Sequence, residues 1–370
     1  MEKMQDKLKS IAANLGISFF SIVIALIVGS FFILLTEQSP ILAYAALFDG
    51  AFGNFRAILN TLWRSTPLIL TGLAVAIPFK AGLFNIGAEG QLLMGGFTAA
   101  VIGFYFTNLP GFIHLPFAVL AGMLAGGIWG GIPGYMKAKL GVHEVIVTIM
   151  LNYIAISLTV NYGINYFRET GRQATPRIME TAALLRFNDM PDHAFWGRIP
   201  FIDIFAQPGI RLHINFLLAI VGAILCWYLL FKTTAGYEMR ATGFNPDGAE
   251  YGGISVSKGM VLAMFISGAL AGLAGVGEAL GTHLSFMAGM DAGHGFTGIA
   301  VALLGLTHPI GVIFAGLLFG ALAQGGLEMQ FAGVPSEIVM IIQALVIFFV
   351  ASLQIFKKYI VKRKAKEEAE

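Results

Sequence analysis

The chain has 370 residues, of which 57% are hydrophobic and only 12% are charged. Soluble domains usually have about 25% charged residues, so this composition predicts an integral membrane protein built from α-helices. The net charge of +2 comes without a basic stripe that would indicate a nucleic-acid partner, and the single cysteine, Cys226, excludes internal disulfides and a cysteine-built metal site.

The first predicted element is a membrane helix over residues 15–36. The basic segment MEKMQDKLKS precedes it, so a secretory signal peptide is the alternative. The apolar run is long and no clear cleavage site of small residues follows it, which favours a retained span. The next segment, 39–64, has apolar residues at helical spacing and predicts a helix lying along the membrane surface.

Ten membrane crossings of about 20 apolar residues are predicted in all. The eighth is too short for an ordinary span. The basic residues near the ends of the spans would lie on one side of the membrane, which predicts cytoplasmic N- and C-termini. The predicted crossings are 15–36, 66–82, 87–107, 114–136, 144–166, 213–231, 258–281, 293–307, 309–329 and 335–356, and the basic clusters are Lys3, Lys7 and Lys9, then Lys137 and Lys139, then Lys232, Arg240 and Lys258, and the tail 357–370.

We therefore predict an all-α polytopic membrane protein forming one permease-like domain over 1–370. Its first half covers about 15–166 and its second half about 213–356, separated by a folded external cap over 167–212 and followed by a cytoplasmic tail. Five crossings in each half make the halves run in opposite senses, which predicts an inverted repeat. Glycines four residues apart predict close helix packing, at Gly122, Gly126, Gly130 and Gly134, at Gly268 and Gly272, and at Gly316 and Gly320.

Two glycine-broken polar stretches interrupt corresponding parts of the two halves. FNIGAEGQLLMGG covers 84–96 and AGMDAGHGFTG covers 288–298. Such a pair is typical of the midplane pathway of transporters. The candidate pathway residues are Phe84, Asn85, Glu89, Gln91, Glu278, His283, Phe286, Asp291, His294 and Phe296.

Glu89 has two compatible interpretations. It could lie beside the pathway with Asn85 and Gln91, because an ionisable group inside a membrane is a functional hypothesis by default. It could also be satisfied by the free backbone N–H groups and the dipole of the third crossing. The aromatic residues near the breaks could stack on a base or sugar, or simply pack. The histidines are not spaced as metal ligands.

A short capped helix is predicted within TTAGYEMRATGFNPDGAEYGGIS, residues 233–255. Asn245 can cap it, Pro246 suits its first position, Asp247 complements its dipole and Gly252 can end it. The helix would have roughly six residues on the cytoplasmic face, and a helix this short is not stable alone in water, so a partner is expected to dock against it.

The same segment resembles the coupling segment of ABC importer permeases for branched-chain amino acids, simple sugars and nucleosides, although Gly248 stands where alanine is expected. The run FNIGAEGQ looks like the nucleoside-type members. The resemblance implies a second permease subunit (a copy or a homologue), cytoplasmic ATPase subunits and an external substrate-binding lipoprotein. It implies ATPase coupling through Gly236, Arg240, Ala241, Gly243, Asn245, Pro246, Asp247, Ala249, Gly252, Gly253 and Ile254.

This sequence carries no G-x-x-x-x-G-K-[ST] phosphate loop. ATP and Mg²⁺ are therefore expected on a partner ATPase, and no cofactor or metal is expected on this chain. We predict a nucleoside permease of a prokaryotic cytoplasmic membrane. A sugar or branched-chain amino acid substrate in the same family, and an ion-coupled secondary transporter, are the alternatives. No catalytic set of nucleophile, base and orienting group is found, so no enzyme activity is predicted.

Overall fold

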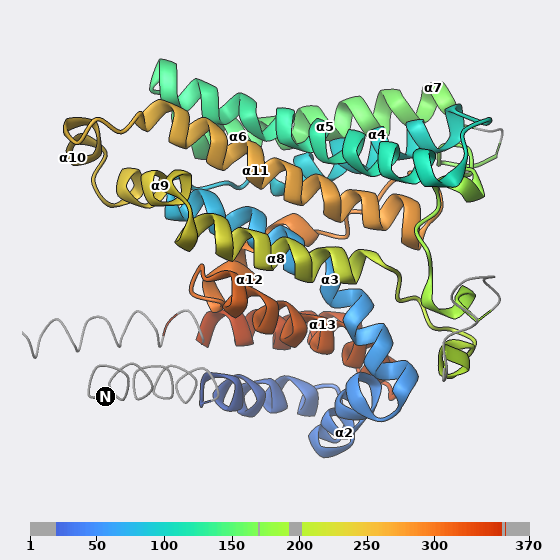
Figure 1. The fold of residues 1–370 in the computed structure, drawn as a ribbon. Helices are drawn as coiled ribbons and strands as arrows, with labels where there is room; N and C mark the ends of the chain where they lie inside the picture. Colours follow the sequence, from blue (N-terminus) through green and yellow to red (C-terminus); the bar gives the residue numbers. More distant parts are fainter. Residues whose placement is uncertain (1–19, 169–170, 192–201, 350–351, 353–370) are drawn as a thin grey trace, which may run out of the picture. The chain divides into compact units, whose positions relative to one another are not determined.

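The computed structural model describes residues 20–168, 171–191, 202–349 and 352, and their regular structure is helical (Figure 1). Within these ranges the extended pairings are isolated antiparallel bridges, Ala174 with Met287 and Arg186 with His213. The predicted all-α class is confirmed.

The chain divides into two compact units, Met1–Ala57 with Leu322–Glu370, and Ile58–Ala321. In the first unit, a helix over Phe20–Leu34, α2 (Pro40–Phe52) and a helix over Ser336–Phe349 contribute to a small apolar core, which includes Ile33, Ala43, Met329 and Ile342. The second unit holds both polar breaks. The predicted inverted halves stay a prediction.

Six helical segments in the described part of the chain are long and apolar enough to cross a membrane. The other apolar helices are shorter, and α4 (Ala88–Tyr105) has 18 residues with a polar first turn. The count of ten therefore stays a prediction. The six are α3 (Phe55–Lys80), α5 (Gly111–Leu140), α6 (Glu144–Ile156) continued by η1 (Ser157–Ile164) and α7 (Asn165–Phe167), α8 (Asn215–Lys232), α11 (Val256–Val276) continued by η6 (Gly277–Thr282), and α13 (Pro309–Phe331).

Parts of the predicted topology lie outside the described residues. These are the start of the first predicted span, the end of the last, the basic cluster before the first span and the tail 357–370.

The helical spacing predicted over 39–64 is interrupted, so the segment is not one continuous helix, and its position along the membrane surface stays a prediction. The helix α2 ends at Phe52, and α3 begins at Phe55 and continues through the whole predicted second crossing. The physical reason is a cap that the apolar spacing did not reveal: the Asn54 side-chain oxygen accepts a hydrogen bond from the backbone N–H of Ala57 at 2.8 Å. Pro67 and Pro78 lie inside α3 without ending it, as membrane helices tolerate.

The predicted short eighth element is α12 (His294–Leu304), with 11 residues. It begins after Gly293, whose φ of 71° places it in the left-handed region, and it ends at Gly305. Its predicted shortness is confirmed.

The cap segment is folded over its described parts, 171–191 and 202–211. It contains the short turns η2 (Glu180–Ala182), η3 (Phe187–Asp189) and η5 (Ile202–Phe205). Its backbone pairs with the loop that follows η6, because Thr175 N donates to Phe286 O at 2.8 Å and Ile178 N donates to Leu284 O at 3.0 Å. Residues 169–170 and 192–201 of the predicted cap lie outside the described residues.

The glycine ridges bring α4, α5 and α11 into backbone contact, as predicted. A Cβ atom on Gly126 would collide with the carbonyl of Gly268, and one on Gly122 would lie 2.8 Å from the carbonyl of Gly95. Figure 1 shows α5 running beside α4 and α11. In α13, glycines pack in the same way on α3, where a Cβ on Gly320 would collide with Ser65. Small residues thus let the helices that carry the breaks approach closely.

This packing yields a matched pair of substitutions on α5. Gly126→Ala is expected to destabilise the fold by about 1–3 kcal/mol, because the added methyl has no space. Gly131→Ala is the control: the nearest atom to its Cβ, from the Phe265 ring, is 3.8 Å away, so the better helix propensity of alanine should leave stability equal or raise it by up to about 1 kcal/mol. Thermal unfolding in detergent micelles measures both, and equal midpoints would contradict the close approach.

Candidate functional site

The first break is observed as the connection 81–87 between α3 and α4, whereas the second part of the predicted stretch 84–96 forms the start of α4, and buried amides hold the break. Asn85 has no exposed surface. Its oxygen accepts from Gly87 N at 2.8 Å, and its nitrogen donates to Gln91 Oε1 at 2.9 Å and to Ser267 Oγ at 2.7 Å. The polar groups that looked costly in a membrane are therefore paired inside the protein.

Asn152 on α6 completes this support and was not among the predicted site residues. Its nitrogen donates to Ile86 O at 3.0 Å, and its oxygen accepts from Gly90 N at 2.9 Å. Both backbone groups belong to the break or to the first turn after it. The available signal was an asparagine inside the apolar run 144–166, since polar residues inside membrane spans usually have a partner or a function.

Glu89 joins the two predicted breaks. Its Oε2 accepts a hydrogen bond from the backbone N–H of Gly295 at 2.6 Å, at the N-terminus of α12. Asp291 shares a side-chain hydrogen bond with it. Thr71 of α3 adds a second tie, because its hydroxyl donates to His294 O at 2.9 Å. The carboxyl group therefore satisfies the N-terminus of α12, where the interpretation from sequence had placed it on the N-terminus of its own helix.

The structure thus brings Glu89 of the first break against Gly295 in the second, while Asn85 and Gln91 bond to each other. Asn85, Glu89 and Gln91 are each at most 2% exposed and bonded within the protein. In this conformation they form the joint between the breaks, and a pathway role for them stays a prediction.

The predicted aromatic residues separate into packed and exposed groups. Phe286 is fully buried, with its ring centroid 5.2 Å from that of Phe97. Phe84 lies against Phe79 at 6.1 Å. Phe296 on α12 is 53% exposed. Packing accounts for the first two, and Phe296 alone of the three predicted phenylalanines retains a large free surface.

Glu278 lies within η6, and His283 follows its end at the start of the connection to α12. The His283 Nε2 atom is 3.6 Å from Glu278 Oε2. Thr282 accepts a hydrogen bond from Trp63 Nε1 at 3.0 Å. Partial burial, followed by the positive charges of Arg211 and Arg186, lowers the pKa of His283, so its ring is neutral at pH 7.

Cations that the sequence did not single out surround η6. The guanidinium carbons of Arg64 and Arg211 lie 5.1 Å and 5.3 Å from the Trp63 ring centroid. Arg186 Nε donates to Gly281 O at 2.9 Å. Cation–π contacts and main-chain bonds therefore hold this end of α11. Arg186 and Arg211 lie far along the chain from the adjacent Trp63 and Arg64, so only the fold could reveal the cluster.

The predicted short helix is present as α10 (Pro246–Tyr251). Asn245 caps it through a hydrogen bond from Gly248 N at 3.1 Å. Gly253, with a φ of 81°, follows its end. A second helix, α9 (Thr234–Phe244), precedes it and was not predicted; the Thr233 side chain starts α9 by accepting from Gly236 N at 3.2 Å.

Three of the residues expected to couple to an ATPase, Gly236, Arg240 and Gly243, are buried or partly buried and hold α9 in place. A Cβ on Gly236 would collide with the carbonyl of Leu229, and a Cβ on Gly243 would collide with the carbonyl of Lys80 at the start of the first break. The Arg240 guanidinium lies 5.2 Å from the Phe231 ring, which in turn stacks on His308. The α9 helix is therefore fixed against α8 and against the α3–α4 turn.

The α10 helix itself is exposed. Phe244 is 96% exposed and Tyr251 is 99% exposed, whereas Ala249 is buried. Figure 1 shows α10 at the end of a loop that extends from α9 and α11. The other predicted coupling residues are exposed or partly so: Ala241, Asn245, Pro246, Asp247, Gly252, Gly253 and Ile254.

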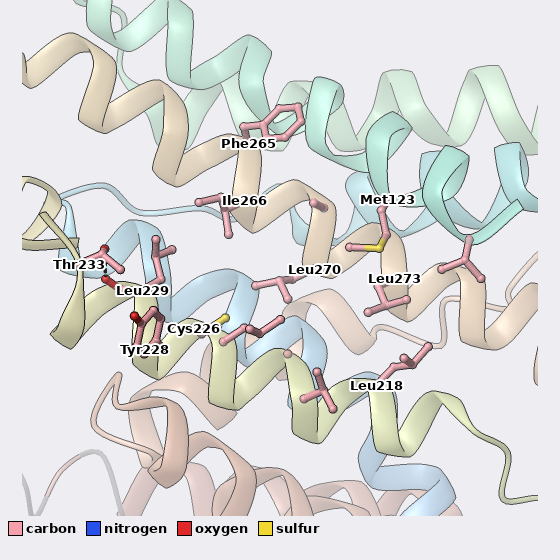
Figure 2. A pocket seen from close by; sticks show the side chains of 15 residues that line it. Met123, Leu218, Cys226, Tyr228, Leu229, Thr233, Phe265, Ile266, Leu270 and Leu273 are labelled. Carbon is pink, nitrogen blue, oxygen red and sulfur yellow. Dashed lines mark hydrogen bonds between the residues drawn. The ribbon is translucent and has the colours of Figure 1, made fainter. Parts of the chain in front are cut away.

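A cavity of about 550 Å³ opens between α5, α8 and α11 (Figure 2). Its walls are almost entirely apolar and include Met123, Cys226, Phe265 and Leu270. A polar solute would find few hydrogen-bond partners here. In the described part of the chain, no three His, Cys, Asp or Glu side chains are grouped so that they could hold a metal ion.

Long apolar helices around two glycine-broken polar segments define a polytopic helical membrane protein of the kind found among transporters. The family model described as branched-chain amino acid transport system / permease component matches residues 57–351. The chain belongs to this family and is a multi-pass membrane protein.

Three relatives cover nearly the whole chain. The guanosine ABC transporter permease protein NupP of Bacillus subtilis (strain 168) is 43% identical over 92% of this chain and 94% of its own. The nucleoside ABC transporter permease protein NupB of Lactococcus lactis is 36% identical over 96% and 95%. The glucose ABC transporter permease protein TsgB13 of Haloferax volcanii is 35% identical over 93% and 89%. No solved structure matches the chain significantly.

The Glu89 contact gives a test of the joint between the breaks. Glu89→Ala leaves the buried Gly295 N–H unpaired and is expected to cost about 1–3 kcal/mol of stability. Glu89→Gln keeps an acceptor oxygen of the same reach, so its loss should be smaller. Thermal unfolding in micelles compares the two variants. An unchanged midpoint for Glu89→Ala would show that the contact does not hold α12.

Proposed function

We propose that this chain is the permease subunit of an ATP-driven ABC importer for nucleosides. Two relatives named as guanosine and nucleoside permeases align with almost its full length, and the better-matching one is 43% identical. The structural observation that carries the proposal is the capped helix α10, which ends at the almost fully exposed Tyr251 and follows the equally exposed Phe244 at the end of α9, while α9 itself packs on the first break.

The proposed coupling follows a continuous set of contacts. A partner ATPase would bind the end of α9 through Phe244 and α10 through Tyr251, and would draw both inward when it closes on ATP. Because Gly243 lies against the backbone of Lys80 and Gly82, movement of α9 would reach the first break directly. From there, the Asn85 amide links to α11 through Ser267, and Glu89 links to α12. ATP and Mg²⁺ would bind to the ATPase.

The proposed partners are cytoplasmic ATPase subunits, a second permease subunit (a copy or a homologue) and an external substrate-binding lipoprotein. The ABC names of the relatives support an ATPase partner. In the proposed orientation, in a prokaryotic cytoplasmic membrane, α10 and both termini face the cytoplasm, and the cap faces the binding protein. The positive arginines around η6 would then lie near the delivery side. The chain would transport substrate and catalyse no reaction.

Uptake into proteoliposomes tests the proposed function. The chain is reconstituted with its ATPase, permease and binding-protein partners, and radiolabelled guanosine is supplied outside. We expect ATP-dependent uptake that excess uridine or adenosine reduces and excess glucose or leucine does not. Competition by glucose and not by nucleosides would indicate a sugar substrate, as named for the Haloferax relative. Uptake driven by a proton or sodium gradient with this chain alone would overturn the ABC mechanism.

The exposed aromatic side chains at the end of α9 and the end of α10, Phe244 and Tyr251, provide a separate test of coupling. Truncating an aromatic anchor at an interface costs about 2 kcal/mol, or about 30-fold in affinity. We therefore expect Tyr251→Ala and Phe244→Ala to weaken ATPase binding by about this factor and to abolish most ATP-driven uptake. Phe112→Ala is the control, because the Phe112 side chain is also highly exposed (80%) but belongs to the first turn of α5 and not to α9 or α10. Binding to detergent-solubilised permease measures the effect, and unchanged binding would rule out α10 as the docking helix.

A further inference from the structure

The cavity of about 550 Å³ between α5, α8 and α11 takes no part in the joint between the breaks (Figure 2). Its wall follows α8 from Leu218 to Thr233, a length of about 22 Å at 1.5 Å per residue. Leu225 and Tyr228 on this wall are 60% and 55% exposed. The cavity is therefore a long apolar groove that opens on the outside of the helices.

Small residues create this groove. Gly222 of α8 and Ala269 of α11 both line it. A Cβ on Gly222 would lie 3.6 Å from the nearest atom, on Leu270, which is ordinary contact and unlike the collision at Gly126. The glycine at position 222 therefore widens the groove and is not needed for close helix packing.

The dimensions of the groove suit a hydrocarbon chain. Dividing its volume by its length gives a mean cross-section of about 25 Å², or about 5 Å across. Non-bonded carbon atoms pack about 4 Å apart, so one extended chain fits this width. A helix with its side chains is about 10 Å across and does not. The apolar walls offer a nucleoside few hydrogen-bond partners.

The three helices of the groove have their ends arranged so that one end of the groove collects charge. Near the end of α5, Ala138 O accepts a hydrogen bond from Ser257 Oγ at the start of α11, at 3.3 Å. At the start of α8, Asn215 Nδ2 donates to Leu273 O near the end of α11, at 3.2 Å. Both α5 and α8 therefore run antiparallel to α11, and their last turns lie at the end where α11 begins.

Each of these helix ends carries an exposed lysine. They are Lys139 in the last turn of α5, Lys232 at the end of α8 and Lys258 in the first turn of α11. Lys137 lies 3.0 Å from Glu144 Oε2, so its charge is already balanced. A groove with apolar walls and positive charge at one end is complementary to an acyl chain joined to a negatively charged headgroup.

Aromatic residues place the same end at the headgroup level of a membrane. Tyr135 and Tyr228 are exposed and lie four residues, about one turn, before Lys139 and Lys232. The Lys232 Nζ atom is 5.7 Å from the Trp227 ring centroid. Tyrosine and tryptophan gather where hydrocarbon meets headgroups, and lysines near helix ends extend to that level. The lysines therefore lie where phosphate groups are found.

We propose that the groove binds one acyl chain of an anionic phospholipid, with the lipid phosphate beside Lys232. The chain lies along α8 and the headgroup lies at the turn between α8 and α9, where Thr233 starts α9. In the proposed orientation this lipid belongs to the cytoplasmic leaflet. Its binding does not depend on the identity of the transported solute.

Photocrosslinking tests the site. The full chain is placed in phosphatidylcholine nanodiscs with a phosphatidylglycerol probe that carries a diazirine on one acyl chain, and mass spectrometry locates the crosslinks. We expect them on the groove wall, in 218–229 of α8 and 265–273 of α11. Unlabelled phosphatidylglycerol should displace the probe at a concentration at least about fivefold lower than phosphatidylcholine, the factor expected from one lysine near a phosphate.

Two variants with matched controls separate the groove from the surrounding lipid. Gly222→Phe fills the groove and should abolish the wall crosslinks, whereas Ile224→Phe, at a 57% exposed position of α8 outside the groove, should not. Lys232→Gln should reduce the preference for phosphatidylglycerol by about fivefold. Arg168→Gln makes the same change of charge at an exposed position after α7 and should leave the preference unchanged.

Three results would overturn the proposal. Crosslinks spread over α5 and α8 outside the groove, and unchanged in Gly222→Phe, would show that no specific site exists. Equal displacement by the two lipids would exclude recognition of the anionic headgroup. Wall crosslinks that vanish when the second permease subunit is added would show that protein covers the groove. Thermal unfolding checks that Gly222→Phe is folded, and Ala269→Leu, which fills the same space from α11, replaces it if it is not.

Discussion

The structure depends on one constraint: every polar group freed where a membrane helix breaks must find a partner inside the protein. Two breaks lie in the unit Ile58–Ala321, and their backbone groups cannot rely on water. Asn85 and Asn152 supply partners at the first break, and Glu89 supplies one to Gly295 at the second. Because these side chains come from different helices, satisfying the breaks also fixes how α3, α4, α6, α11 and α12 meet.

Glycine packing makes those bonds possible. The side-chain amides are short, so they reach their partners only if the helix backbones approach closely. The contacts of Gly122 and Gly126 on α5 with α4 and α11 supply that approach. The two kinds of interaction therefore stabilise one another, and together they leave Asn85, Glu89 and Gln91 with at most 2% exposed surface.

The same close packing offers a physical basis for coupling. The α9 helix touches the α3–α4 turn through Gly243 without an intervening side chain, so a displacement of α9 could not be absorbed by a rotamer change. Packed elements of this kind switch between discrete arrangements rather than deform continuously. Family membership and the named relatives make a nucleoside importer the function these contacts serve best.

The sequence by itself determined the helical membrane class, the two breaks, the short α12 and the capped α10, because apolar periodicity and local caps act over a few residues. It missed the start of α3, since the Asn54 cap was hidden within a longer apolar pattern, and it missed α9. Only the tertiary structure decided that Glu89 caps α12, that Asn152 supports the first break, and that Arg211 lies over the Trp63 ring. Those contacts join residues up to 206 positions apart, and no local pattern encodes which distant group a buried polar atom will meet.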